Sequence, residues 1–142
     1  LNDYRQGDAQ DIASKMAALI PDYKDRAPCV LLSGGELTVT VKGPGKGGPN
    51  TEFLIGLAMS LNGAENVYAI ACDTDGIDGS GDNAGAVITP DTLKLAIASR
   101  LDPVAALREN DSYNFFKALD DLIITGPTYT NVNDFRAIII SN

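Results

Sequence analysis

The stretch at residues 33–50 constrains this chain more than any other part of it. It reads Ser-Gly-Gly-Glu-Leu-Thr-Val-Thr-Val-Lys-Gly-Pro-Gly-Lys-Gly-Gly-Pro-Asn, so a glycine pair precedes one carboxylate, Glu36, and further glycines follow a short alternating run. Glycine loses more backbone entropy on folding than other residues, and a chain keeps it where φ is positive or where the backbone approaches another group closely. We therefore expect residues 43–48, called the glycine loop below, to fold tightly between a strand and a helix.

Hydrophobic periodicity predicts strands that alternate with helices, and hence the α/β class. A chain of 142 residues is long enough for one core, and we expect a layered α/β/α arrangement with a mixed β-sheet in a single compact domain. The helix after the glycine loop is apolar on almost every side, which predicts burial against a sheet and against a further domain. The expected helices are 9–20, 50–62, 89–100, 103–109 and 112–119, and the expected strands are 29–32, 37–41, 67–72, 85–88, 122–124 and 137–140.

Local signals add expectations about particular segments. The wholly apolar run at 29–32 predicts a strand that is buried on both faces. Asn50 is expected to cap a helix that Asn62-Gly63 ends. Residues 1–8 are polar, and we expect them to be frayed.

The composition excludes several classes of function. The net charge of -8 repels the phosphates of nucleic acids, and the absence of histidine excludes Ser-His-Asp sites, Cys-His sites and histidine-based zinc sites within this chain. Cys29 and Cys72 lie in apolar runs, so we expect buried structural thiols. No apolar run is long enough to span a bilayer, and no signal-peptide pattern opens the chain. We expect a cytoplasmic protein without nucleic-acid or membrane partners and, because it begins with Leu1, a fragment or a processed chain.

Residues 73–83 form an acidic loop after the strand expected at 67–72. They read Asp-Thr-Asp-Gly-Ile-Asp-Gly-Ser-Gly-Asp-Asn, and such carboxylates repel one another unless a cation or hydrogen-bond donors neutralise them. Carboxylates at strand ends commonly hold Mg²⁺ beside nucleotide phosphates, so Asp75 and Asp78, each followed by glycine, are candidate metal ligands. The alternative is a loop of Asx turns in which the aspartates accept backbone N–H bonds.

The glycine loop has three interpretations. Gly43, Gly45 and Gly48 match the dinucleotide-binding fingerprint, because they follow a strand, open a helix and precede Asp73. Two prolines in the same stretch lack N–H donors and weaken that interpretation. A glycine-rich turn without a ligand is the second. The third is that Gly43, Gly45, Gly47 and Gly48 line the phosphates of a ligand in one site with the acidic loop.

Residues 125–134, the polar loop, carry almost only hydrogen-bonding side chains between two expected strands. A loop of this composition can bind a polyhydroxylated acid, or it can satisfy its own turns.

Together these segments resemble the C-terminal MOFRL domain of the bacterial glycerate kinases that form 2-phosphoglycerate, a family formerly labelled hydroxypyruvate reductase. The resemblance covers residues 29–140. It implies that residues 1–142 form a MOFRL-like C-terminal domain, with a leading helix and connector at 1–28 and the motif-bearing core at 29–142. The motifs are Leu31-Leu-Ser-Gly-Gly-Glu36 with Thr38-Val-Thr-Val41, the glycine loop with Asn50-Thr-Glu52, Thr74-Asp-Gly-Ile-Asp-Gly79, Asn110-Asp-Ser-Tyr113, and Thr125-Gly-Pro-Thr128 through Thr130-Asn-Val-Asn-Asp134.

The resemblance implies transfer of the ATP γ-phosphoryl group to the 2-hydroxyl of D-glycerate. It implies a Rossmann-like N-terminal domain outside this chain, which supplies a lysine and much of the nucleotide site, and a cleft between the two domains. Glu36 and Asp75 are then the catalytic acids. Asp75 binds Mg²⁺ or accepts the hydroxyl proton, and Asn131 contacts glycerate.

One departure from the family pattern affects substrate binding. Many members have arginine where this chain has Pro49, and we expect Lys46 to substitute as a point charge, with Asn50 as a further substrate-binding residue. The isolated chain is expected to be inactive, because it lacks a complete nucleotide site, and homodimerisation is left open. The alternatives are an NAD(P)H-dependent hydroxypyruvate reductase and a non-catalytic ligand-binding module.

Overall fold

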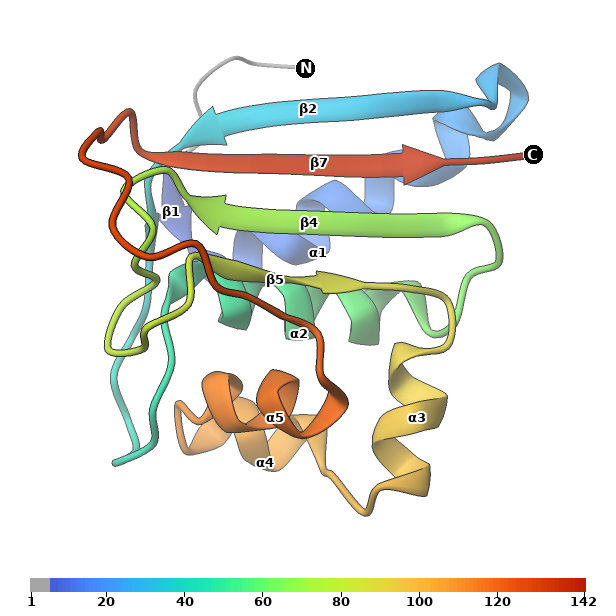
Figure 1. The fold of residues 1–142 in the computed structure, drawn as a ribbon. Helices are drawn as coiled ribbons and strands as arrows, with labels where there is room; N and C mark the ends of the chain where they lie inside the picture. The colour runs from blue at the N-terminus through green and yellow to red at the C-terminus, as the bar shows by residue number, and fades with distance from the viewer. Residues whose placement is uncertain (1–5) are drawn as a thin grey trace.

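A five-stranded antiparallel sheet organises the fold in the computed structural model, which describes residues 6–142 (Figure 1). The strands lie in the order β2-β7-β4-β5-β6, and every neighbouring pair is antiparallel. A separate parallel pair joins β1 to β3. Of the segment expected to be frayed, residues 1–5 lie outside the described residues, whereas Gly7 and Asp8 form β1. The strands are β1 (Gly7–Asp8), β2 (Cys29–Gly35), β3 (Leu37–Thr38), β4 (Val67–Asp73), β5 (Gly85–Ile88), β6 (Leu122–Ile123) and β7 (Asp134–Ile140).

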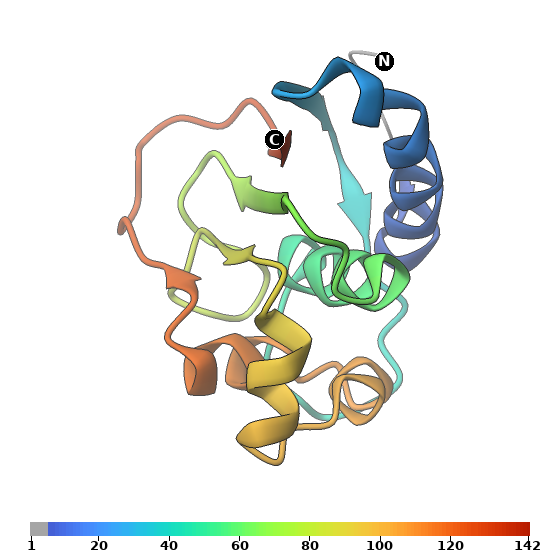
Figure 2. The same ribbon diagram turned by 90° about the vertical axis from the view of Figure 1, so that its right-hand side faces the viewer.

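The helices cover one face of the sheet, as the side view in Figure 2 shows. Helices α1 and α2 pack against the sheet, and α3, α4 and α5 pack against α2 from the far side. No helix in the described part of the chain is both long enough and apolar enough to span a membrane. The helices are α1 (Ala9–Leu19), the 3-10 turn η1 (Ile20–Arg26), α2 (Pro49–Leu61), α3 (Thr92–Ala98), α4 (Pro103–Arg108) and α5 (Ser112–Leu119).

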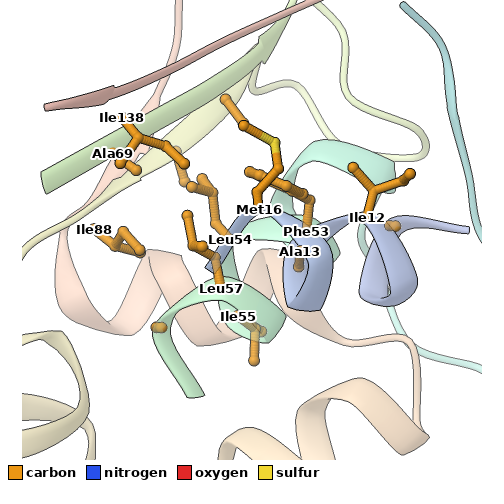
Figure 3. Packing of buried hydrophobic residues seen from close by; sticks show 14 of the residues in the cluster. Ile12, Ala13, Met16, Phe53, Leu54, Ile55, Leu57, Ala69, Ile88 and Ile138 are labelled. Atoms are coloured by element: carbon orange, nitrogen blue, oxygen red, sulfur yellow. The ribbon is translucent and has the colours of Figure 1, made fainter. Parts of the chain in front are cut away.

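Helix α2 occupies the centre of the core (Figure 3). Phe53, Leu54, Ile55 and Leu57 are completely buried, between α1, the sheet and the helices beyond. The predicted burial of this helix is confirmed, and Asn62 ends it in the left-handed conformation, with φ of 47°. All of its neighbours belong to this domain, so this apolar surface is not available to the further domain that we expected α2 to contact.

The other face of the sheet has no helical layer. In β7, Ile138 and Ile140 are buried on the helical side, while Phe135 and Ile139 are each 43% exposed on the other side. In β2, Val30 and Leu32 lie on the exposed side, so the strand expected to be buried on both faces is buried on one. The α/β class and the single domain are confirmed, and the α/β/α layering is corrected, because all the described helices lie on one side of the sheet.

The antiparallel pairing also has a topological cause. Strands β2 and β4 run in the same direction and are linked through α2, which is the pattern that predicted parallel pairing. Strand β7, the last in the chain, lies between them and runs the opposite way, so each of its pairings is antiparallel. The expected mixed sheet is therefore corrected to an antiparallel main sheet with one parallel pair, β1 and β3, outside it.

Several element ends differ from expectation. Strand β2 continues through the glycine pair to Gly35, and β7 begins earlier, at Asp134. Helix α3 begins at Thr92 rather than at residue 89, and two of its apolar side chains, Leu95 and Ile97, are 49% and 73% exposed. Only Ala96 and Thr92 are fully buried in this helix, because it contacts the core along one narrow strip.

Candidate active site

Three predicted segments meet at one edge of the sheet. Gly35, Asp134 and Asp73 lie opposite one another on β2, β7 and β4, at the left-hand end of the strands in Figure 1. Glu36 follows Gly35, the acidic loop begins at Asp73, and the polar loop ends at Asp134. Glu36, the acidic loop and the polar loop therefore lie at one edge of the sheet, which is called the rim below.

Hydrogen bonds join the loops at this rim. The Gly47 N–H donates to the Ser80 hydroxyl at 3.2 Å, and the Ser80 N–H donates to the Gly47 carbonyl at 3.1 Å, which fastens the glycine loop to the acidic loop. The Thr128 N–H donates to the Asp75 carbonyl at 3.0 Å, which fastens the polar loop to the acidic loop. The three loops consequently form one continuous surface.

The backbone N–H groups of the glycine loop are already used within the chain. The Asn110 side-chain oxygen accepts from Lys42 at 2.6 Å and from Gly43 at 2.8 Å. A phosphate cradle needs N–H groups that point at the ligand. The geometry therefore argues against Gly43, Gly45, Gly47 and Gly48 as a phosphate loop. The other acceptors are the Glu109 carbonyl for Gly45, the Asp111 carboxylate for Lys46, the Ser80 hydroxyl for Gly47 and the Thr51 hydroxyl for Gly48.

Close backbone packing explains the glycines instead. A Cβ atom on Gly43 would clash with the backbone of Glu109, and a Cβ atom on Gly48 would clash with Asp78. Glycine is thus required because two stretches of main chain approach each other without room for a side chain.

Asp78 caps helix α2 from a distant part of the sequence. Its two carboxylate oxygens accept the N–H groups of Asn50 and Thr51, each at 2.9 Å, and the Thr51 hydroxyl at 2.8 Å. The N-cap residue itself is Gly48, which has no side chain, so the expected cap by Asn50 is corrected. A carboxylate at this position also interacts favourably with the helix dipole.

This cap changes two site predictions. Asp78 is 1% exposed, and burial raises its pKa, although the hydrogen bonds from Asn50 and Thr51 oppose the rise. Asn50 is completely buried, and its amide donates to both Asp78 and Asp134. The geometry therefore gives Asp78 and Asn50 structural roles rather than contact with a metal or a substrate.

A buried cluster around Asp134 completes the scaffold beneath the rim. Asp134 accepts from the Asn50 amide and from the Leu37 N–H, each at 2.7 Å. Arg136, which is completely buried, lies 3.4 Å from Asp134 and donates to the Ser33 hydroxyl at 3.2 Å. Through Leu37, the cluster fixes the turn that carries Glu36.

Asp75 and Asn131, two predicted site residues, line a shallow cavity of about 450 Å³ that opens widely to the surface at the rim. The Asp75 carboxylate accepts the Ile77 N–H at 2.8 Å through one oxygen, Oδ1. The Asn131 side-chain oxygen accepts the Asn133 N–H at 2.9 Å, so its NH₂ group remains available as a donor. The cavity is completed by Ile77, Pro127, Tyr129 and Thr130.

Glu36 and Lys46 lie outside this cavity. Glu36 is exposed at the same rim. The Lys46 ammonium group is 3.8 Å from the centre of the Tyr113 ring, and the Tyr113 hydroxyl donates to Asp82 at 2.8 Å. This hydrogen bond, with the charges of Lys46 and Lys117, lowers the pKa of Asp82. The predicted substrate role of Lys46 therefore requires it to leave a cation–π contact.

A second cavity, of about 340 Å³, lies beside the glycine loop and contains a residue that the sequence interpretation did not single out. Glu52, which is 2% exposed, is among its lining residues and accepts from the Asn110 amide at 2.6 Å. Burial raises the pKa of Glu52, while the bonds from Asn110 and Gln10 lower it. The sequence did contain a signal for Glu52, because a charged residue within an otherwise apolar helix indicates a buried polar contact. Arg136, within an apolar strand, gives the same signal.

The cysteines and the candidate metal ligands were also tested by the geometry. Cys29 and Cys72 are free thiols, half-buried rather than fully buried, and burial raises the pKa of Cys72 to about 11. Within residues 6–142, no group of three or more histidine, cysteine, aspartate or glutamate side chains is arranged to hold a metal ion. Because Asp78 is occupied at α2, the predicted pair of Asp75 and Asp78 does not fit a Mg²⁺ site.

Known proteins share both the sequence and the fold. A protein of Agrobacterium vitis named "Putative hydroxypyruvate reductase" is 50% identical over 99% of this chain, which spans 38% of that protein. The D-glycerate 2-kinase of Thermotoga maritima is 46% identical over 79% of this chain, which spans 28% of it. A crystal structure of a glycerate kinase from Thermotoga maritima superposes with a TM-score of 0.92 at 39% identity, covering 96% of this chain and 34% of its own.

The chain thus spans between about a quarter and two fifths of the length of these relatives. Residues 29–134, which carry Glu36, Asp75, Asn131 and the glycine loop, match the model of the MOFRL family. This chain belongs to the MOFRL family.

Proposed function

We propose that this chain is one domain of a glycerate kinase and that it binds the acceptor hydroxy acid at the rim. The observation that carries the proposal is the placing of Asp75 and Asn131 in one open cavity, at the same edge of the sheet as Glu36. It is supported by relatives named glycerate kinase, one of which has the same fold at 39% identity.

Each residue has a specific task in this proposal. The 2-hydroxyl oxygen of D-glycerate attacks the γ-phosphorus of ATP, the bond from that phosphorus to the β-phosphate oxygen breaks, and ADP leaves. Asp75 accepts the hydroxyl proton, Asn131 donates a hydrogen bond to the acid, and exposed Glu36 orients the acceptor or a cationic group. A general base of this kind contributes about 10²–10⁴ to the rate.

The phosphates need positive charge that this part of the site does not provide. In the described chain, no lysine or arginine lines the cavity at the rim or the cavity beside the glycine loop. Phosphoryl transfer depends on cationic groups that neutralise charge on the transferring phosphoryl. We therefore propose that the remainder of a longer polypeptide supplies them together with the ATP site, and that the isolated chain is inactive.

The competing function is reduction of hydroxypyruvate by NAD(P)H, which the name of the 50% identical relative suggests. In dinucleotide-binding folds the pyrophosphate sits at the N-terminus of the helix after the glycine motif. Here the Asp78 carboxylate occupies the N-terminus of α2, so a pyrophosphate would have to displace a buried anion. This favours the kinase.

A pair of assays on the full-length polypeptide separates the two. We expect ADP formation from ATP and D-glycerate, measured with a coupled assay, and no NAD(P)H oxidation with hydroxypyruvate. Asp75→Asn should lower kcat at least about a hundredfold. Asp82→Asn, at an exposed carboxylate of the same loop outside the cavity, should leave kcat within about threefold. Wild-type kcat in Asp75→Asn would refute the role of Asp75, and activity in neither assay would favour a ligand-binding module.

A further inference from the structure

The uncovered face of the sheet carries a continuous apolar surface, here called the outer face. Val30, Ile139 and Tyr68 lie opposite one another across β2, β7 and β4, and their exposed fractions are 52%, 43% and 41%. In the adjoining rows, Leu32 is 57% exposed and Phe135 is 43% exposed. The face shown in front in Figure 1 is crossed by no helix.

Along β2, β7 and β4, the outer face contains no charged side chain. The positions between these exposed residues are Gly34, Ala137, Ile70 and Cys72. A chain with a net charge of -8 places its carboxylates elsewhere and leaves this surface neutral. Contiguous apolar surfaces of this kind mark interaction sites.

The geometry connects this face to the candidate site. Phe135 on β7 and Cys72 on β4 pair with each other, one residue before the sheet edge where Asp134 and Asp73 meet. A protein domain that packs on the outer face therefore also reaches the rim. Such a domain can place cationic side chains beside Asp75, where the described cavity has none.

The length of the relatives indicates what such a domain is. The glycerate kinase chain of known structure contains this fold as 34% of its length, so about two thirds of that chain lies outside the matched region. A second copy of this chain is a poorer candidate, because two bodies of net charge -8 repel each other and bring no excess of cations.

We propose that the outer face is the surface on which the rest of a full-length family polypeptide packs against this domain. The packing follows from the apolar surface alone, and its contribution of cations to the rim rests on the proposed function. Helix α2, the segment that the sequence suggested for this contact, is already enclosed, whereas the outer face is an apolar surface that a large partner can reach.

Cysteine labelling tests the proposal. Leu32→Cys and the control Ile97→Cys, on α3 and 73% exposed, are each made in the 142-residue chain and in the full-length polypeptide. Maleimide labelling rates are measured peptide by peptide with mass spectrometry, so the native cysteines remain in place. We expect labelling of Leu32→Cys to be at least tenfold slower in the full-length protein, and labelling of Ile97→Cys to be equal in the two.

Two results would overturn the proposal. Equal rates for Leu32→Cys would show that the face stays open. Protection that rises with protein concentration to the same degree in both forms would assign the face to a second copy. Hydroxyl-radical oxidation of Tyr68 and Phe135 in the unmodified proteins gives the same comparison if a variant does not fold. Neither measurement depends on catalysis, so a full-length protein without kinase activity would refute the proposed function and leave this result intact.

Discussion

Asp78 accepts both the backbone N–H and the side-chain amide of Asn50, at 2.9 and 3.3 Å, although the two residues are 28 positions apart. A residue of the acidic loop thus holds the start of the central helix. The same contact joins the acidic loop to the start of α2, two segments that the sequence predicted to bind a ligand. It also determines how several substitutions should behave.

Asp78→Ala should destabilise the domain by about 2–3 kcal/mol, because it removes the cap and leaves buried N–H groups without acceptors. Urea denaturation at pH 7 measures the change. Asp91→Ala is the matched control, since the exposed Asp91 side chain makes no capping bond at α3, and its effect should stay within about 0.5 kcal/mol. Equal stability of the two variants would contradict the structural role of Asp78.

Glu52→Gln should reduce the pH dependence of stability. The folded-state pKa of Glu52 lies above its ordinary value of 4.5, so the folded chain retains a proton that the unfolded chain has released. The stability contributed by this group is present below pH 4.5 and is lost as the pH rises through the folded-state pKa.

The measurement is the free energy of unfolding at several values from pH 4 to pH 8. The fall with rising pH should be smaller in Glu52→Gln than in the wild type. It persists in part, because burial also raises the pKa values of Asp73, Asp78 and Asp121. Glu65→Gln, at an exposed carboxylate, should reproduce the wild-type profile. An unchanged profile in Glu52→Gln would contradict the burial of that carboxyl.

Gly43→Ala distinguishes packing from phosphate binding in the glycine loop. The added methyl group meets the backbone of Glu109, so the variant should lose about 1–3 kcal/mol of stability without any ligand present. Gly126→Ala, where the methyl group enters open space but φ is 70°, should cost about 1 kcal/mol. A fully stable Gly43→Ala chain that loses only nucleotide affinity in the full-length enzyme would restore the phosphate-loop hypothesis.

Arg136→Ala should destabilise by about 3–5 kcal/mol, because it leaves the buried carboxylate of Asp134 without its cation. Arg100→Ala, at an exposed arginine, should have little effect. The double variant Arg136→Ala with Asp134→Asn should recover part of the loss, since the neutral amide no longer needs a counter-charge. Strict additivity of the two changes would argue against their interaction.

The sequence predicted where helices and strands lie along the chain better than it predicted how they pack and pair in space. Helix α2 could be found from its apolar run and its Asn62-Gly63 end, and α4 from Asp102-Pro103, because these signals are local. The position of β7 between β2 and β4 could not be found in this way, since pairing between distant strands leaves no mark in either segment. That single placement changed the sheet from mixed to antiparallel.

The site predictions divide along the same line. Asp75 could be inferred from its Asp-Gly turn, whereas Asn131 was implied by the family resemblance, and the two residues share a cavity. Asp78 has the same local pattern as Asp75, an aspartate followed by glycine, yet one is buried beneath α2 and the other lines the cavity. Tertiary contacts alone distinguish them. Arg136 was missed because a strand context predicts apolar neighbours and does not reveal a buried partner such as Asp134.

The alternation of side chains along β7 limits how the gene for this domain can change over time. Removing one residue of β7 ahead of Arg136 would turn its guanidinium outward and exchange the two faces for every later position in the strand. Insertions and deletions should therefore accumulate in residues 124–133, where the chain is exposed, while the strand keeps a fixed length. Differences in substrate choice would then arise from changes in residues 124–133, while β7 keeps its length and its pairing.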